Sequence, residues 1–426
     1  MGSAPSADLE SRSPRDVSLP WFESLTPRLQ PGHHINLLSC GKDFFPTLVR
    51  SIQNARESVA VETYMFNDDR SGRQVAQALV DAAGRGVRVR CVADGFGTPR
   101  LEGEVAELMS QTGIEFETFR PERFRFSLDR QRLRRLHRKL IVIDNREAFI
   151  GGINLLDDWI DPNHGELDSP RLDYAVQVFG PLVASANLAV SRLWWELSLV
   201  NRSLRKPRPS GAPREDGEPF STPTQTTTDI TSTGDMKAML IVRDNLRHRR
   251  TIERWYLAEI AKASDDVLIA NAYFLPGVRF RKALFEAVAR GVRVRLLLQG
   301  KVEYKMQHWA TQALYDELLA NGVEVYEYQR SFLHAKVAVI DHQATVGSSN
   351  IDPFSLLLAR EANVMIDNQV FADSLRGKLT AAITDDSTKL ELSKHRRRPW
   401  QLRAMNWVSF VMLRLAVAIT GQGANY

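Results

Sequence analysis

The chain has 426 residues, of which 43% are apolar and 25% are charged, with a formal net charge of +5 at pH 7. This composition is ordinary for a soluble globular protein, and the length allows two or three domains. The small positive charge favours an anionic partner, either nucleic acid or a membrane surface, without deciding between them. Only two cysteines are present, Cys40 and Cys91, which excludes a zinc site built on cysteine spacing and predicts buried, reduced thiols in a cytosolic protein.

Two segments are poor in the apolar runs that a packed core needs. Residues 1–30 contain no apolar stretch of a secretory signal, so we expect a disordered tail there. Residues 206–235 carry five prolines and a threonine-rich run, which indicate a loop or linker. We place the boundary in a linker at 204–235, between a first lobe at residues 31–203 and a second lobe at 236–392.

The two predicted lobes repeat one order of elements. Residues 58–66 and 266–274 are apolar stretches that predict equivalent strands. Residues 70–95 and 277–300 each have apolar residues at helical spacing, then a glycine, then another apolar stretch, which predicts a helix followed by a strand. The repeated strand–helix–strand order predicts a largely parallel or mixed sheet covered by helices.

The most informative repeat is a phrase that combines a histidine, a lysine and an aspartate. Residues 136–144 read LHRKLIVID, and residues 333–341 read LHAKVAVID. Within a strand, a histidine and a lysine at alternate positions project from the same face. Two such copies predict that both phrases meet around one anionic group.

Each phrase is followed by a glycine-led segment that ends in asparagine, and together they resemble the paired HKD motifs of the phospholipase D superfamily. The matching residues are His137, Lys139, Asp144 and Asn154 in the first copy and His334, Lys336, Asp341 and Asn350 in the second. The resemblance covers residues 33–370. It implies an α/β fold of two homologous α-β-α sandwich lobes with mixed sheets, related by a pseudo-twofold axis, with the active site at the lobe interface.

These residue types suit the transfer of a phosphodiester. A neutral imidazole is a competent nucleophile near neutral pH, and the resemblance implies that role for His137, with His334 as general acid and base. Lysine and asparagine side chains can stabilise the charge on phosphoryl oxygens. Phosphate contacts are therefore implied for Lys139, Lys336, Asn154, Ser348, Ser349 and Asn350. No carboxylate cluster suited to Mg²⁺ is evident, so we expect no metal and no other cofactor.

Three positions of the motifs need separate comment. Gly152 stands where the superfamily usually has serine, so a hydroxyl donor to phosphate is missing from the first copy. Asp144 and Asp341 belong to the catalytic motif, and we expect them to hold the motif loops as scaffold residues instead of transferring protons.

Two acidic residues occupy equivalent places after the motifs. Asp173 and Glu361 each precede apolar residues at the third and fifth places, which predicts equivalent strands. By analogy with the superfamily, Asp173 orients His334 and Glu361 orients His137, each across the pseudo-twofold axis. The alternative is two solvated acids at strand starts. Glu62 and Tyr64 lie in VETYMF, a stretch similar to bacterial cardiolipin synthases, and a role in lining the substrate pocket is expected for both.

Three features favour a lipid substrate over a nucleic acid. Residues 348–364 closely resemble cardiolipin synthases. Residues 123–139 combine seven arginines with apolar side chains, a mixture that suits a phospholipid interface but also a nucleic acid or a solvated basic face. Residues 393–426 join a basic cluster to apolar stretches that Arg414 interrupts and that are too short to span a bilayer, which predicts an amphipathic, membrane-associating segment. Docking of this helix on the protein core is the alternative.

The resemblance therefore implies a bacterial cardiolipin synthase of the short form, without N-terminal transmembrane helices. Such an enzyme passes phosphatidyl from one phosphatidylglycerol to another through a phosphohistidine and releases glycerol. Phosphatidylethanolamine is a further candidate substrate, and an anionic membrane surface but no nucleic acid is the expected partner. The expected location is the cytoplasmic face of the bacterial inner membrane, as a peripheral protein. The alternatives are a phosphodiesterase or nuclease that uses water, and a membrane-binding scaffold without activity.

Overall fold

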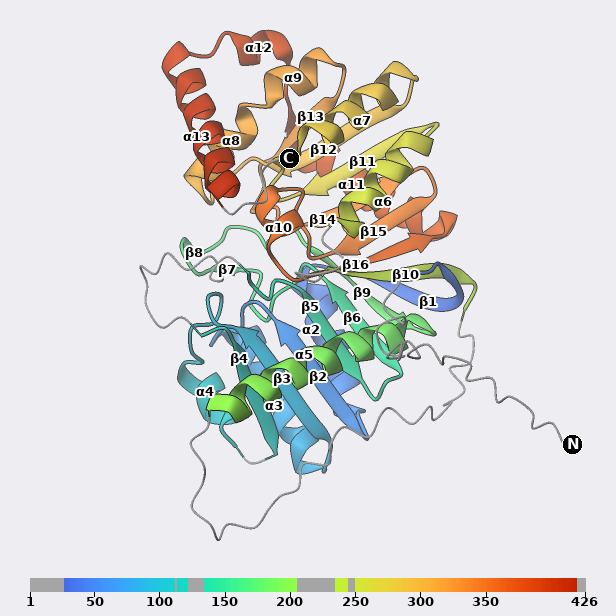
Figure 1. Cartoon of the computed structure of the whole chain (residues 1–426), viewed down its shortest axis with the longest axis vertical. Helices are drawn as coiled ribbons and strands as arrows, with labels where there is room; N and C mark the ends of the chain where they lie inside the picture. Colours follow the sequence, from blue (N-terminus) through green and yellow to red (C-terminus); the bar gives the residue numbers. More distant parts are fainter. Residues whose placement is uncertain (1–26, 112, 122–133, 205–233, 244–249, 420–426) are drawn as a thin grey trace, which may run out of the picture.

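The computed structural model describes residues 27–111, 113–121, 134–204, 234–243 and 250–419 (Figure 1). Most of the predicted N-terminal tail, of the linker and of the arginine-rich stretch that begins at Arg123 lies outside the described residues, and β1 begins at Gln30, the last residue of the predicted tail.

The first lobe contains a sheet with helices on both of its faces. Its elements are β1 (Gln30–Ser39), α2 (Cys40–Gln53), β2 (Ser58–Thr63), α3 (Arg70–Gly84), β3 (Arg88–Asp94), α4 (Gly103–Met109), β4 (Ile114–Phe119), β5 (Lys139–Ile143), β6 (Glu147–Gly151), β7 (Ile160–Asp161), β8 (Gly165–Glu166), β9 (Tyr174–Phe179) and α5 (Leu182–Leu204). Helices α2, α3 and α4 pack on one face of this sheet, and α5 packs on the other.

The second lobe repeats this order and then extends it. Its elements are β10 (Met236–Arg243), α6 (Thr251–Lys262), β11 (Asp266–Asn271), α7 (Val278–Ala289), β12 (Arg293–Gln299), α8 (Lys305–Gln312), α9 (Tyr315–Ala320), β13 (Glu324–Tyr328), β14 (Lys336–Ile340), β15 (Gln343–Gly347), α10 (Pro353–Leu357), β16 (Glu361–Asp367) and α11 (Gln369–Asp386). The extension consists of β17 (Ser387–Lys389), α12 (Leu392–Arg396) and α13 (Trp400–Ile419).

The strands of both lobes form one mixed, 15-stranded sheet in the order β17-β13-β12-β11-β14-β15-β16-β10-β1-β9-β6-β5-β2-β3-β4. At its centre β1 pairs antiparallel with β10, and these strands open their respective lobes. Within each lobe three strands are parallel, β2-β3-β4 and β11-β12-β13, and the rest pair antiparallel. The prediction of two homologous α-β-α lobes with mixed sheets is confirmed.

The helices form where the sequence pattern predicts them. In α3, Val75 and Leu79 are fully buried, and the Asp69 carboxylate caps the first turn by accepting a hydrogen bond from Gly72 N at 2.9 Å. In α7, Phe280 and Leu284 fill the equivalent positions against β11 and β12. One hydrophobic cluster runs through both lobes and joins α5 and α11 to the central strands, so the lobes share a core. Figure 1 shows the lobes as two halves of one body.

Candidate active site

Backbone contacts between the lobes position both motif histidines. The residue before each histidine forms a β-bridge with the other lobe, Leu136 with Arg360 and Leu333 with Leu172. His137 N donates to Arg360 O at 3.0 Å, and His334 N donates to Leu172 O at 2.8 Å. Each histidine is thereby held beside the acidic residue that follows in the other lobe.

Each imidazole is hydrogen-bonded to that acid. His137 Nδ1 lies 3.0 Å from Glu361 Oε1, and His334 Nδ1 lies 2.6 Å from Asp173 Oδ2. The carboxylates are almost inaccessible to solvent, whereas the imidazole side chains keep 17% and 15% of their surface exposed. A carboxylate at Nδ1 favours the tautomer whose Nε2 carries a free lone pair, as a nucleophile or general base requires.

The two dyads differ in how the acid is held. The Ser348 hydroxyl donates to Glu361 Oε2, whereas the shorter Asp173 faces Gly152, which has no side chain. A Cβ atom at position 152 would lie 2.3 Å from Asp173 Oδ1, so a serine there requires this acid to move. The Ser348 hydroxyl thus contacts the acid of the first dyad, and the phosphate contact expected for it stays a prediction. Gly152 in the first lobe and Ser348 in the second occupy equivalent positions, and the glycine leaves room for Asp173 where the serine contacts Glu361.

Two buried lysines lie beneath the histidines. Lys139 Nζ donates to His137 O at 2.7 Å, and Lys336 Nζ donates to His334 O. Loss of solvation, reinforced by repulsion from Lys336, lowers the pKa of Lys139 to about 7, and burial lowers the pKa of Lys336 to about 8. An anion placed beside these ammonium groups would favour their charged forms, because an opposite charge offsets the cost of desolvation.

Burial also lowers the pKa of both histidines. Desolvation dominates at His137, while the nearby Glu361 opposes the shift. At His334 desolvation acts together with repulsion from Lys336 and Lys139, which takes its pKa well below the usual value. The unliganded site therefore holds two neutral imidazoles at neutral pH, which is the reactive form of a nitrogen nucleophile.

The predicted amide and hydroxyl groups have varied partners. Asn154 Oδ1 accepts a hydrogen bond from Met65 N at 3.3 Å, and the residue lines a cavity beside His334. Asn350 is buried, and its Oδ1 has no hydrogen-bond partner within the described parts of the chain. The Ser349 hydroxyl donates to Asn350 O at 3.3 Å. Asn154 and Asn350 are the side chains of this group that retain capacity for a ligand.

The two residues expected to line the pocket have different surroundings. The Tyr64 ring centroid is 5.0 Å from that of His137 and 5.3 Å from Lys139 Nζ, so Tyr64 borders the site. Glu62 is buried beside α5. It forms an ion pair with Arg138, whose guanidinium also donates to Ala189 O in α5. Glu62 therefore ties β2 and β5 to α5.

Sequence reasoning missed two groups around the histidines. Asp94 and Gln299 end the equivalent strands β3 and β12, and their side chains accept hydrogen bonds from Leu136 N at 2.7 Å and Leu333 N at 3.0 Å. The sequence signal that could have identified them is their equivalent position at the ends of the two repeated strands. The second group lies in a cavity of about 460 Å³ beside His334 and Asp173, which includes Arg171, Glu303 and Tyr304. These loop residues do not repeat between the lobes.

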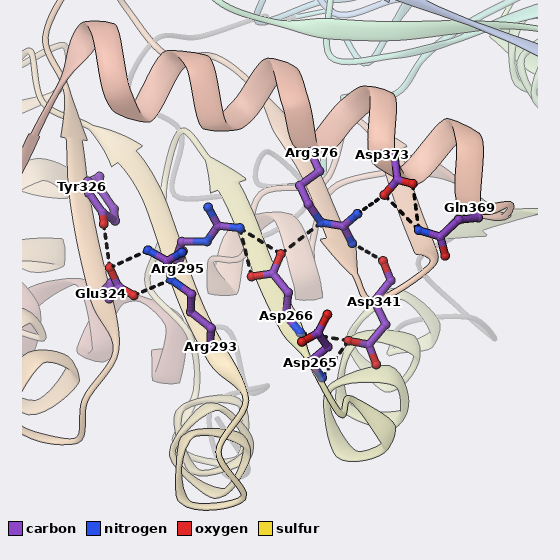
Figure 2. A network of polar contacts seen from close by, with 10 residues as sticks. All are labelled: Asp265, Asp266, Arg293, Arg295, Glu324, Tyr326, Asp341, Gln369, Asp373 and Arg376. Atoms are coloured by element: carbon purple, nitrogen blue, oxygen red, sulfur yellow. Dashed lines mark hydrogen bonds and ion pairs between the residues drawn. The ribbon is translucent and has the colours of Figure 1, made fainter.

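The motif aspartates lie at the opposite end of the motif strands from the histidines, and the five-residue strands between them span about 16 Å at the usual rise. Asp144 accepts hydrogen bonds from the backbone N–H groups of residues 56–58, and Asp341 accepts them from residues 264–266. Both adopt left-handed backbone angles, with φ of 51° and 49°. Figure 2 shows Asp341 among Asp265, Asp266 and Arg376 of α11. The contacts are those of scaffold residues.

A family model described as "Cardiolipin synthase, PLD-like domain" matches residues 48–165 and 256–382, which contain both motifs. The chain belongs to the phospholipase D-like cardiolipin synthase family. It is 36% identical over 400 residues to cardiolipin synthase B of Shigella flexneri and of Escherichia coli (strain K12), a match that covers 92% of this chain and 90% of each relative. A cardiolipin synthase of Geobacillus kaustophilus is 28% identical over 88% of this chain and 70% of the relative.

Solved structures share the fold at low sequence identity. The phosphatidylserine synthase of Haemophilus influenzae superposes with a TM-score of 0.64 at 11% identity, covering 94% of this chain and 98% of that one. The polyphosphate kinase of Porphyromonas gingivalis gives a TM-score of 0.52 at 13% identity, covering 90% and 53%. These likenesses concern the fold alone. With its family established, this cardiolipin synthase is a phosphatidyltransferase, as the sequence predicted.

The scaffold assignment of Asp341 leads to a test of stability. Desolvation opposes ionisation of this carboxyl, but hydrogen bonds from Asp266, Ser264 and Asp265 outweigh it and lower its pKa below the usual range. We expect Asp341→Ala to reduce the free energy of unfolding by about 1–2 kcal/mol at pH 7, because three N–H groups lose their acceptor. Activity per folded molecule should stay within about twofold, since the carboxylate is remote from the histidines.

The pH dependence follows from the direction of the shift. A carboxyl whose pKa is lower in the folded state stabilises the fold above its unfolded pKa and loses this effect as pH falls. Urea unfolding at pH 7 and near pH 3.5 should therefore show a smaller difference between wild type and variant at the lower pH. Asp385→Ala, at an exposed position in α11, is the control. A stable Asp341→Ala enzyme that has lost activity about 100-fold would contradict the scaffold assignment.

Proposed function

We propose that this enzyme makes cardiolipin from two molecules of phosphatidylglycerol by way of a phosphatidyl-histidine at His137. The observation that carries the proposal is the pair of dyads, His137 with Glu361 and His334 with Asp173, set beside two buried lysines. A site of this kind offers one imidazole to attack phosphorus and another to move a proton, which divides a difficult displacement into two steps.

In the first step, His137 Nε2 attacks the phosphorus of the donor lipid. The bond from phosphorus to the glycerol oxygen breaks, and this oxygen takes a proton from His334. In the second step, His334 removes the proton from a hydroxyl of the acceptor lipid, whose oxygen attacks phosphorus as the bond to His137 breaks. The proton taken from the acceptor replaces the one that His334 gave to glycerol, so each turnover releases one glycerol and leaves the enzyme unchanged.

The substrate itself supplies the condition for the first proton transfer. His334 is neutral in the unliganded site because of desolvation and repulsion from the lysines. A bound phosphodiester carries a negative charge that offsets this repulsion and raises the proton affinity of His334. Lys139 and Lys336 then stabilise the phosphoryl oxygens while charge shifts to the departing oxygen.

Lipid product analysis tests the reaction. With vesicles of phosphatidylglycerol in EDTA, the purified chain should form cardiolipin and glycerol in equal amounts, because lysines and histidines supply the positive charge and the proton transfers. His137→Ala should abolish product, whereas His342→Ala, at an exposed histidine of the β14–β15 turn, should retain full activity. Formation of phosphatidic acid alone would indicate transfer to water, and recovery of activity only with Mg²⁺ would contradict a metal-independent reaction.

We further propose that α13 is the membrane contact, on the cytoplasmic face of the bacterial inner membrane. Residues Asn406, Ser409 and Leu413 face the second lobe and are buried. The opposite face is apolar and exposed to solvent, whereas a surface helix usually turns its apolar face to the core and its polar face to solvent. Its large side chains are Trp400, Trp407, Val408, Met412 and Leu415. No helix within the described residues is both long and apolar enough to cross a bilayer, so contact by this one face is proposed.

The basic cluster before α13 is divided between two roles. Arg396 and Arg397 are exposed and can attract anionic headgroups. Arg398 instead donates to Gln312 Oε1 of α8 at 2.7 Å, and Asn406 Nδ2 lies 3.4 Å from the same oxygen. The helix thus docks on the core and also presents an apolar face. Figure 1 shows α13 at the edge of the second lobe, next to α8.

Substitution of the outward tryptophans tests this contact. The double variant Trp400→Ala, Trp407→Ala should bind anionic vesicles at least about tenfold more weakly, because each indole loses the burial that the lipid gives it. Cosedimentation measures binding, and added salt should weaken the wild type further. Trp195→Ala, at an exposed position of α5 in the first lobe, is the control. Unchanged binding by the double variant, or an equal loss in the control, would contradict the assignment.

A further inference from the structure

The cavity beside His334 is built from both lobes. The β6–β9 loop of the first lobe contributes Asn154, Asp158 and Arg171, and the β12–α8 loop of the second contributes Glu303 and Tyr304. About 460 Å³ of space lies between these residues, part of it open to solvent. The catalytic dyad of His334 and Asp173 forms part of its wall, whereas His137 does not line it. The cavity therefore lies on the side of the site where, in our mechanism, alcohols leave and enter.

The far wall of the cavity is organised around Glu303. Tyr273 Oη donates to Glu303 Oε2 at 2.6 Å, and the rings of Tyr273 and Tyr304 lie 5.9 Å apart. The described contacts of Glu303 engage Oε2, so Oε1 is the oxygen available to a ligand hydroxyl.

The first-lobe wall is held rigidly by its own contacts. Arg171 donates to Ile160 O and to Asp161 Oδ2, both at 3.1 Å. Asp161 Oδ1 accepts hydrogen bonds from the backbone of Asn163 and His164. Both oxygens of Asp161 therefore accept hydrogen bonds from its own loop. Glu303 and Asp158 each have one carboxyl oxygen engaged in the described contacts, so each has an oxygen that can bind a ligand. Arg171 lines the same cavity as Glu303 and Asp158, and its positive charge acts on both carboxyls.

We propose that this cavity is a polyol subsite, in which a glycerol headgroup lies with its reacting hydroxyl at His334 and a second hydroxyl at Glu303. The inference rests on the proposed function and adds to it the residues that select the alcohol. Glu303 is the specificity residue, because it meets the part of the alcohol that does not react. The same subsite holds glycerol as it leaves the donor and the glycerol headgroup of the acceptor as it enters.

The charge balance of the cavity favours a polyol over an ammonium headgroup. Desolvation raises the pKa of Asp158 to about 7, so this carboxyl is partly protonated at neutral pH, and desolvation also raises the pKa of Glu303 above its usual value. Arg171 and Lys336 add positive charge that acts on Glu303. A partly protonated carboxyl both donates and accepts hydrogen bonds, which suits neutral hydroxyls, whereas ethanolamine and choline require a firm negative charge.

Headgroup exchange separates recognition of the alcohol from the chemistry. The full chain is incubated with phosphatidylglycerol vesicles and ¹³C-labelled glycerol, 1-propanol or ethanolamine, and labelled phosphatidylglycerol, phosphatidylpropanol and phosphatidylethanolamine are measured by mass spectrometry. Propanol has one hydroxyl and makes no second contact. Glu303→Gln should therefore raise the half-saturating concentration of glycerol about tenfold, while the rate with propanol stays within about twofold. Glu286→Gln, at an exposed glutamate of α7, is the matched control and should behave as wild type.

Each outcome has one meaning. A Glu303→Gln enzyme that loses glycerol and propanol transfer equally would overturn the subsite, because the defect would then lie in folding or chemistry and not in alcohol selection. A wild-type enzyme that prefers ethanolamine to glycerol would also overturn it. Absence of transfer to every alcohol by the wild type would overturn the proposed function, and with it this inference. Selective loss of glycerol by Glu303→Gln supports both.

Discussion

The candidate active site depends on one interaction, the hydrogen bond between each motif imidazole and an acid from the other half of the chain. Neither lobe holds a complete dyad by itself, because His137 pairs with Glu361 and His334 pairs with Asp173. Buried charges of this kind are costly unless they are paired and hydrogen-bonded. The continuous sheet through β1 and β10 and the core shared by α5 and α11 hold the lobes at the separation that these pairs require.

The repeat is symmetric in its backbone and asymmetric in its chemistry. Both histidines receive the same backbone contact and the same kind of Nδ1 partner, but Glu361 is held by Ser348 and the shorter Asp173 faces Gly152. The cavity adds a larger difference, since it opens at His334. Two similar histidines that precede equivalent strands thereby have different surroundings. In the proposed mechanism, one attacks phosphorus, and the other exchanges protons with the alcohols that leave and enter.

The fold and the pairing of the two motifs could be predicted from the sequence, because the strand and helix pattern and the motif each occur twice in the chain. The repeated strand and helix patterns predicted the lobes, and the equivalent places of Asp173 and Glu361 pointed to contacts that the structure contains. The cavity could not be predicted, since Arg171, Glu303 and Tyr304 lie on loops of unlike length. Glu62 and Tyr64 were grouped because both lie in a stretch similar to cardiolipin synthases, but β2 ends at Thr63, so strand alternation does not relate their side chains. In α13, both faces contain apolar residues, so only packing distinguishes them.

Trapping the covalent intermediate tests the central claim most directly. A nitrophenyl phosphodiester has a leaving group that needs no proton, so His334→Ala should still give a burst of nitrophenolate and a long-lived adduct. Intact-mass measurement after acid-free quenching, followed by peptide mapping, should place this adduct on His137. His137→Ala should give neither burst nor adduct, because it lacks the attacking imidazole. An adduct on His334 in the His137→Ala protein would contradict the account and reverse the roles of the two histidines.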